Sequence, residues 1–219
     1  MCFSAKSSFV ASFLLSVIGF LTVKKNTIRR ELPYALFPLV FSLQQFIEGV
    51  LWVFLVNNSG TNTSFLVVSF VFIAQVFWPI WVPFSFWLAE KSKFQKSFLS
   101  FLLAIGFLSG LINFIQLFTS ETVAKSSMNH IQYFAKNASP VGSMGFVFYL
   151  FATILPPFVS SLKNTGFIGF LLFSSFITSY FFYQDYIISV WCYFASIVSV
   201  FIYFSIETNT KNIIIARDK

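Results

Sequence analysis

Long runs of apolar residues separated by short polar segments make up most of this chain. Most runs approach or exceed the roughly 20 residues that an α-helix needs to cross the hydrocarbon core of a bilayer. The pattern predicts an all-α membrane protein, a single bundle of seven transmembrane helices with no second domain. The predicted helices cover residues 8–23, 34–56, 65–89, 97–118, 143–162, 166–183 and 187–206, and we expect residues 207–219 to form a frayed cytoplasmic tail.

Prolines and glycines interrupt several of these runs. The third run contains WPIWVP, in which Pro79 and Pro83 lack an N–H group. We expect them to kink or unwind the helix and to free backbone carbonyls inside the bundle. Pro156 and Pro157 lie in the second half of the fifth run, and Gly106 begins a GxxxG spacing, which permits close helix packing.

Composition and charge support the membrane class and predict an orientation. Hydrophobic residues make up 57% of the chain and charged residues 10%, against about 25% charged in soluble domains. The net charge of +7 does not indicate a nucleic-acid partner, because the basic residues lie in short segments between apolar runs. With the N-terminus outside and the C-terminus cytoplasmic, the outer segments hold Lys6, Lys125 and Lys136, and the other eleven of the 14 basic residues are cytoplasmic.

Polar side chains gather on one face of the second predicted helix, in the segment SLQQFIEGVLW. Gln44, Gln45, Glu48 and Trp52 stand at i, i+1, i+4 and i+8, which places them on one side of a helix. Glu48 is the one acid that we expect deep in the membrane, where a carboxylate is costly unless it faces the bundle interior or a partner. The pattern predicts a functional site at Glu48, in the outer half of the bundle.

The same orientation brings other chemically capable side chains to the outer half. His130, the single histidine, lies in the predicted outer loop 119–142, which is long enough to fold back as a lid. The residues predicted to bind a ligand are Gln44, Gln45, Trp52, Gln75, Trp78, Tyr183 and Trp191.

Three chemical interpretations of the cysteines stay open. If Met1 is removed, Cys2 presents a thiol beside a free amine, and Cys2, His130 and Glu48 would act as nucleophile, base and orienting carboxylate. Alternatively, Cys2, His130 and Cys192 would bind zinc together with Glu48, or copper with the help of Met144. A disulfide between Cys2 and Cys192 is the third interpretation, since both lie on the oxidising outer side.

Neither metal nor catalysis is supported by a local motif. No paired CxxC or HxxxH spacing occurs, and a lone histidine is common as a hydrogen-bonded loop residue. Trp78 is equally typical of helix packing, and Cys192 belongs to a seam of small residues that suits helix contacts.

Several blocks resemble one family, namely MCFSA at 1–5, LQQFIEGVLW, WPIWVP, HIQY at 130–133, LPP at 155–157 and SVWCYFA at 189–195. It is an uncharacterised family of bacterial multi-pass membrane proteins that begin MCFSA. Asn129 stands here where the family has a second histidine, which weakens a two-histidine metal site. The resemblance implies the bacterial inner (cytoplasmic) membrane and no particular activity.

Together these patterns predict an outward-facing polar pocket around Glu48 that binds a lipid or small amphiphile. In the enzymatic interpretation the protein processes this ligand as a thiol- or metal-dependent hydrolase or transferase. A proton-coupled transporter that uses Glu48 and a ligand-binding sensory bundle are the alternatives. We expect membrane lipids as partners and no nucleic acid.

Overall fold

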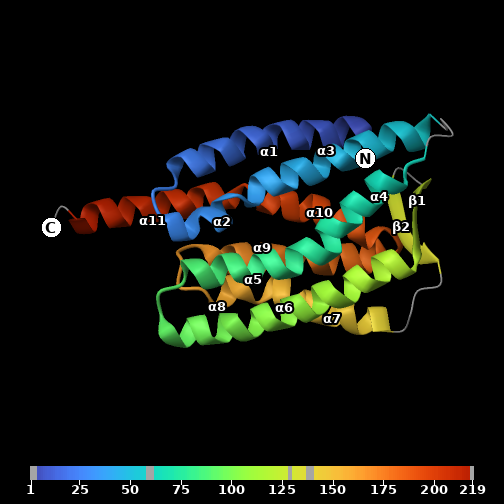
Figure 1. The fold of residues 1–219 in the computed structure, drawn as a ribbon. Coiled ribbons are helices and arrows are strands. Elements are labelled where there is room, and N and C mark those ends of the chain that lie inside the picture. The colour runs from blue at the N-terminus through green and yellow to red at the C-terminus, as the bar shows by residue number, and fades with distance from the viewer. Residues whose placement is uncertain (1–3, 58–61, 128–129, 137–140, 218–219) are drawn as a thin grey trace.

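The computed structural model describes residues 4–57, 62–127, 130–136 and 141–217. It is a bundle of roughly parallel and antiparallel helices with a short β-hairpin at one end (Figure 1). The elements are α1 (Ala5–Lys25), η1 (Arg29–Glu31), α2 (Leu32–Ala35), α3 (Phe37–Val56), α4 (Ser64–Val71), η2 (Phe72–Phe77), α5 (Trp78–Ala89), α6 (Lys93–Thr119), β1 (Glu121–Ser127), β2 (His130–Lys136), α7 (Val141–Ile154), α8 (Pro156–Val159), α9 (Thr165–Phe182), η3 (Gln184–Tyr186), α10 (Ile187–Val198) and α11 (Phe201–Arg217).

Within the described residues, six helical stretches are long and apolar enough to cross a membrane. They are Ala5–Lys25, Arg29–Val56, Ser64–Ala89, Lys93–Thr119, Thr165–Phe182 and Gln184–Thr210. The fifth predicted span corresponds to the shorter apolar stretch Met144–Val159, which is broken between α7 and α8. The mostly helical, membrane-compatible architecture is therefore confirmed, and the fifth predicted span contains a break beside Pro156 and Pro157.

The prediction of an all-α fold is wrong in the segment between α6 and α7. There β1 and β2 pair as an antiparallel hairpin, with Ala124 opposite Tyr133. Ile131 and Tyr133, two residues apart on one face of β2, are buried, and the Tyr133 ring stacks on Phe70 of α4 at 4.6 Å between centroids. A two-stranded hairpin is marginal by itself, so this packing on the helices is what stabilises it.

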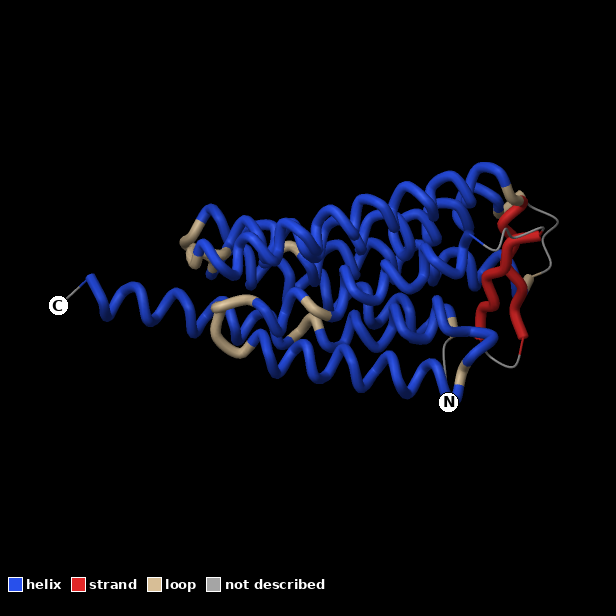
Figure 2. The backbone as a smooth tube through the Cα atoms, turned by 90° about the horizontal axis from the view of Figure 1, so that it is seen from below, coloured by secondary structure: helices blue, strands red, loops and turns tan. Residues whose placement is uncertain are grey.

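The two ends of the bundle differ in charge. The hairpin marks one end, and the loops α1–α2, α5–α6 and α8–α9 meet at the other (Figures 1 and 2). Lys25, Arg29, Lys91 and Lys163 lie in or beside those loops, so we name the two ends the hairpin end and the basic end.

The C-terminal segment differs from the predicted frayed tail. α11 continues as a helix to Arg217 and extends past the other helices at the basic end (Figure 2). Several polar contacts hold its first part to the bundle, and two of them are short. The Ser205 hydroxyl donates to the carbonyl of Lys163 at 2.7 Å, and Glu207 forms a salt bridge with Lys25 at 3.3 Å.

The prolines of WPIWVP shape the contact between α5 and α6. Because Pro83 has no N–H, the carbonyl of Pro79 loses its usual helical donor, and Gly106 of α6 packs on it so closely that a Cβ there would overlap the oxygen. Pro79 in turn removes the donor for the carbonyl of Gln75, which accepts a hydrogen bond from Asn113 Nδ2 at 2.9 Å. Freed carbonyls thus account for the close approach of these two helices.

Glu90 connects the end of α5 to the loop before α9. Its carboxylate accepts hydrogen bonds from the backbone N–H groups of Lys91 and Ser92 at 2.8 and 2.9 Å, and from the N–H and the hydroxyl of Ser161, both at 2.7 Å. Burial acts to raise the pKa of Glu90, but these donors outweigh it and leave the pKa below its ordinary value.

We expect Gly106→Ala to lower the free energy of unfolding by roughly 1–3 kcal/mol, because the added methyl group meets the rigid backbone of Pro79. Thermal unfolding of the detergent-purified protein measures this. Gly166→Ala is the matched control, since no atom lies within 4 Å of a Cβ added there. Equal destabilisation by both substitutions would contradict the packing argument.

A second prediction concerns pH. A carboxylate whose pKa is lowered on folding stabilises the fold above its unfolded pKa and loses this effect as pH falls through its folded pKa. The wild type should therefore be more stable than Glu90→Gln near pH 7, and the difference should shrink as pH is lowered to about 3. Melting temperatures of both proteins across this range provide the measurement, and a constant difference would refute the assignment.

Candidate functional site

A layer of buried polar side chains crosses the bundle between two apolar clusters. Gln44, Gln45 and Glu48 of α3 and Ser189 of α10 are all buried, and we call these four the polar layer. One apolar cluster contains Phe41 on the basic side of this layer, and the other contains Leu51 on the hairpin side. α3 thus turns its polar face inward, toward α10.

Glu48 forms a hydrogen bond within this layer. The Ser189 hydroxyl donates to Glu48 Oε1 at 2.5 Å, and the Glu48 residue is only 2% exposed. The bond joins α3 to α10, two helices that are far apart in the chain. Ser189 opens the SVWC block, so the bond joins two of the sequence blocks that stood out.

Gln44 connects the polar layer to α5 and to Cys192. The indole Nε1 of Trp78 donates to Gln44 Oε1 at 2.8 Å, while the Trp78 ring stacks on Phe41 at 4.1 Å between centroids. The Gln44 side chain also lies beside the buried thiol of Cys192. The structure therefore gathers Glu48, Gln44, Trp78 and Cys192 in one region.

The hairpin contributes Tyr133 to this region. Burial raises the pKa of the Tyr133 hydroxyl well above its ordinary value, and the neighbouring Glu48 and Cys192 raise it further. Tyr133 thus lies close enough to both groups to respond to their charge.

His130 packs against tyrosines at the start of the segment that leads into α10. Its ring stacks on Tyr186 at 4.8 Å and meets the edge of Tyr183 at 5.2 Å. Burial lowers the pKa of His130, which favours the neutral imidazole. The structure thus places His130 and the predicted ligand residue Tyr183 together, against η3.

Several buried polar atoms around the polar layer have no hydrogen-bond partner among the described residues. They are Gln44 Nε2, both amide atoms of Gln45, Trp52 Nε1, Tyr133 Oη and Trp191 Nε1. Each such buried group costs about 1–3 kcal/mol if it stays unsatisfied. Since buried polar groups are normally hydrogen-bonded, this cluster makes the region around the polar layer the candidate functional site.

Three cavities adjoin this region. The first, about 50 Å³, is lined by Tyr34, Phe37, Phe41, Trp78, Val82, Phe86, Tyr149, Thr153, Pro157, Ile168, Leu172, Trp191, Cys192, Ala195, Val198, Ser199 and Ile202. The second, about 110 Å³, is lined by Ala74, Gln75, Asn113, Gln116, Phe146, Tyr149, Ile187, Ile188, Trp191 and Cys192. The third, about 180 Å³, is lined by Val71, Gln75, Asn113, Gln116, Leu117, Thr122, Tyr133, Phe134, Ala135 and Ile188.

Shared walls show that the cavities form a row. Tyr149, Trp191 and Cys192 line both the first and the second cavity. Gln75 is among the residues that line both the second and the third, which reaches the hairpin. Glu48 and Gln44 line none of these three cavities, and both lie near Cys192, which lines the first two.

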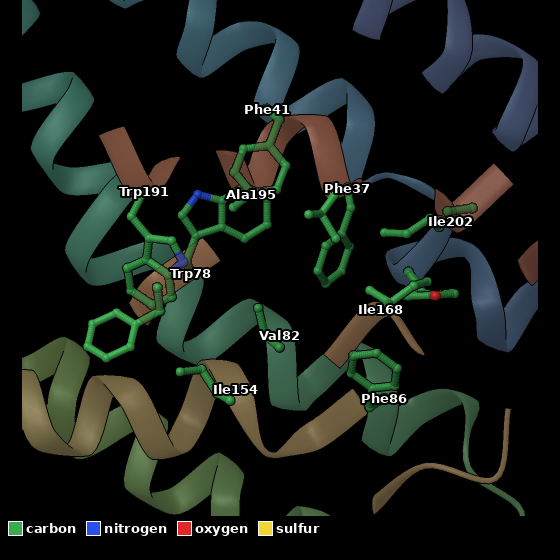
Figure 3. Packing of buried hydrophobic residues seen from close by; sticks show 14 of the residues in the cluster. Phe37, Phe41, Trp78, Val82, Phe86, Ile154, Ile168, Trp191, Ala195 and Ile202 are labelled. Atoms are coloured by element: carbon green, nitrogen blue, oxygen red, sulfur yellow. The ribbon is translucent and has the colours of Figure 1, made fainter. Parts of the chain in front are cut away.

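Three interrupted helices surround the first cavity. Val82 belongs to α5, which follows the π-helical turn η2. Thr153 and Pro157 flank the break between α7 and α8, and Ser199 and Ile202 flank the break between α10 and α11. Figure 3 shows Phe37, Phe41, Trp78 and Trp191 reaching into the same part of the bundle, among the side chains of the apolar cluster around this cavity.

Serine side chains account for the break between α10 and α11. The hydroxyls of Ser196 and Ser199 donate to the carbonyls of Tyr193 and Ser196, both at 2.6 Å. Such bonds compete with the helical pattern and bend helices. Irregular backbone at this depth is tolerated where protein or a cavity surrounds it.

The catalytic and metal hypotheses depend on a residue outside the described part of the chain, Cys2. Among the described residues, no three His, Cys, Asp or Glu side chains come together as a metal site. Cys192 is buried in α10, and Met144 is exposed on α7. Zinc, copper, the Cys2 nucleophile and the disulfide therefore stay predictions.

Sequence reasoning missed Tyr133 and Tyr149 as members of this region, and it assigned no role at the site to Asn113 or Ser189. Tyr133 stands in HIQY and Ser189 in SVWC, so both blocks contained the signal. Tyr149 lies in an apolar run with no polar neighbour to mark it, and its position appears only when α7 packs against α10.

The chain belongs to the family described as "Family of unknown function (DUF6629)", whose family model matches residues 1–217. The resemblance to an uncharacterised family is confirmed to this extent. Comparison with curated proteins and with solved structures found no match.

We expect Ser189→Ala to lower the free energy of unfolding by about 1 kcal/mol, because it removes the hydroxyl bound to buried Glu48. Ser196→Ala, on the same helix, removes only a local bond to Tyr193 and should cost less. Thermal unfolding in one detergent compares the two. A larger loss in Ser196→Ala would contradict the importance of the cross-helix bond.

Proposed function

We propose that this member of DUF6629 is an integral membrane protein that binds a small amphiphile inside its helix bundle. The apolar chain of the ligand would occupy the first cavity, and its polar group would lie in the second. The observation that carries the proposal is the pairing of an apolar cavity with an amide-lined cavity across a wall of three side chains, Tyr149, Trp191 and Cys192.

The first cavity suits a single hydrocarbon chain. Trp78 and Phe86 both line it and stand eight positions apart on α5, so it extends over about 12 Å along this helix. Its volume of about 50 Å³ is well below the roughly 300 Å³ at the low end of ligand pockets, so binding would require the side chains around it to move apart. Apolar, aromatic walls with a few polar groups are typical of small-molecule sites.

Broken helices provide a second argument. Membrane proteins that bind small molecules at mid-depth often build the site from discontinuous helices. Here the interrupted helices α4–α5, α7–α8 and α10–α11 all contribute to the first cavity. The same feature keeps the proton-coupled transporter open as an alternative, with Glu48 as the proton-carrying group.

The orientation that we propose follows the charges. Lys25, Arg29, Lys91 and Lys163 gather at the basic end, which would be cytoplasmic under the positive-inside rule. The hairpin end would then face outward, and the amide-lined cavity would be the one nearer the outer surface. Together with the resemblance, this favours the bacterial inner membrane as the location.

Processing of the ligand is an extension of this proposal. A hydrolase or transferase would need Cys2 or a metal close to the polar group of the ligand, and Cys2 lies outside the described residues. The sensory alternative would use the same pocket and would require a partner protein.

Filling the first cavity should abolish binding. We expect Val82→Phe to lower the affinity for monolaurin, a neutral single-chain amphiphile, at least about tenfold, because the added ring occupies the space of the alkyl chain. Equilibrium binding to protein in phosphatidylcholine nanodiscs measures this. Val147→Phe, the same substitution at an exposed position of α7, is the control.

Unchanged monolaurin affinity in a folded Val82→Phe protein would refute the cavity as the binding site. A loss of similar size in Val147→Phe would show that the effect is not specific to the cavity.

A further inference from the structure

We infer that the ligand has an uncharged polar group with an acceptor oxygen, such as a hydroxyl, ester or ketone, and that Trp191 Nε1 binds this oxygen. The inference rests on the proposed function, since it assigns the chemical class of the ligand in the same pair of cavities. Two independent observations carry it: the described cavity walls contain no charged side chain, and the indole Nε1 of Trp191 has no hydrogen-bond partner among the described residues.

The cavity walls carry no formal charge. None of the described residues that line the three cavities is an Asp, Glu, Lys, Arg or His. A buried charged group is costly unless a counter-charge pairs with it. A carboxylate, phosphate or ammonium group in these cavities would therefore lack a partner in the walls.

Two ionisable groups beside the first two cavities also disfavour an anion. Cys192 forms part of the wall, and Glu48 lies near it, bonded to Ser189. Both groups are neutral or negative, so neither attracts an anionic ligand. The carboxamides of Gln75, Asn113 and Gln116 line the second cavity and can exchange hydrogen bonds with a neutral polar group.

Trp191 stands at the junction of the two cavities with a buried donor. Its Nε1 has no acceptor within hydrogen-bond distance among the described residues, and the residue is only 7% exposed. The ring is held by edge-to-face contacts with Tyr149 and Phe176, at 5.5 and 5.1 Å between centroids. An unpartnered N–H on a residue that lines both cavities is suited to an acceptor oxygen of a ligand there.

Other indoles of the bundle are placed differently. Trp78 donates to Gln44 and Trp81 donates to the carbonyl of Pro33. Trp52 resembles Trp191 in having an unpartnered Nε1, but it lines none of these three cavities. Among these indoles, Trp191 is thus the one that combines an unpartnered Nε1 with a place in the lining of both the first and the second cavity.

The test compares three amphiphiles with chains of similar length, namely monolaurin, laurate and dodecyltrimethylammonium, in the same nanodiscs. We expect monolaurin to bind at least about tenfold more tightly than either charged amphiphile. Equal or tighter binding of laurate would overturn the inference. Preference for dodecyltrimethylammonium would overturn it as well and would indicate Glu48 as the group that recognises the ligand.

Variants distinguish the contribution of the Trp191 N–H group from that of the shape of the pocket. Trp191→Phe keeps an aromatic ring but removes the N–H, and should weaken monolaurin binding about fivefold. Trp87→Phe is the control, since Trp87 packs beneath Lys96 and lines none of these cavities. Should Trp191→Phe fail to fold, Gln116→Leu tests the second cavity, with an expected loss of a few-fold.

The outcomes distinguish the two proposals. If none of the three amphiphiles binds the wild type, the proposed function is wrong. A different outcome is that monolaurin binds and Val82→Phe abolishes binding, while Trp191→Phe and Gln116→Leu leave it unchanged. The first cavity would then be supported as the binding site, and the inferred contacts of the ligand's polar group would be refuted.

Discussion

Inside an apolar bundle, every backbone carbonyl that loses its helical hydrogen bond needs another partner. The contact between α5 and α6 depends on this constraint. Pro79 and Pro83 free two carbonyls, and α6 meets them with an amide donor from Asn113 and with the bare backbone of Gly106. The carbonyl of Gln75 is thereby satisfied beside the second cavity. Helix breaks that would destabilise an isolated span are thus compensated by contacts with the neighbouring helix.

The polar layer is a second consequence of burial. It separates the apolar cluster around Phe41 from the cluster around Leu51, and it joins α3 to α10 through Glu48 and Ser189. Hydrogen bonds are directional whereas apolar contacts are not, so this bond helps to determine how α10 lies against α3. That relation places Trp191 and Cys192 at the wall between the first two cavities.

The local sequence pattern predicted the features that depend on a single helix. The spacing of Gln44, Gln45 and Glu48 identified the inward face of α3, and apolar runs located six long helices. Features that depend on two distant segments were missed. The partner Ser189 becomes visible only when α10 packs on α3, and the hairpin is stabilised by the stacking of Tyr133 on Phe70 rather than by a strong turn signal.

The helix breaks also differ in whether the local sequence predicts them. Pro156 and Pro157 marked one break in advance, because proline cannot donate a backbone hydrogen bond. The break between α10 and α11 contains neither proline nor glycine, and it arises from serine hydroxyls that bind nearby carbonyls. Such serines are also common in intact helices, so their effect could be assigned only from the folded geometry.

Two nearly inaccessible carboxylates illustrate how hydrogen bonding separates a structural group from a candidate functional group. Glu90 accepts four hydrogen bonds from neighbouring backbone and Ser161, which fully explains its burial as a link between helix ends. Glu48 accepts a hydrogen bond from Ser189, has the Gln45 amide beside it, and stands near indole donors that have no partner in the described part of the chain. Burial alone would rank the two acids equally, and the difference in satisfied donors is what directs attention to the region beside Glu48.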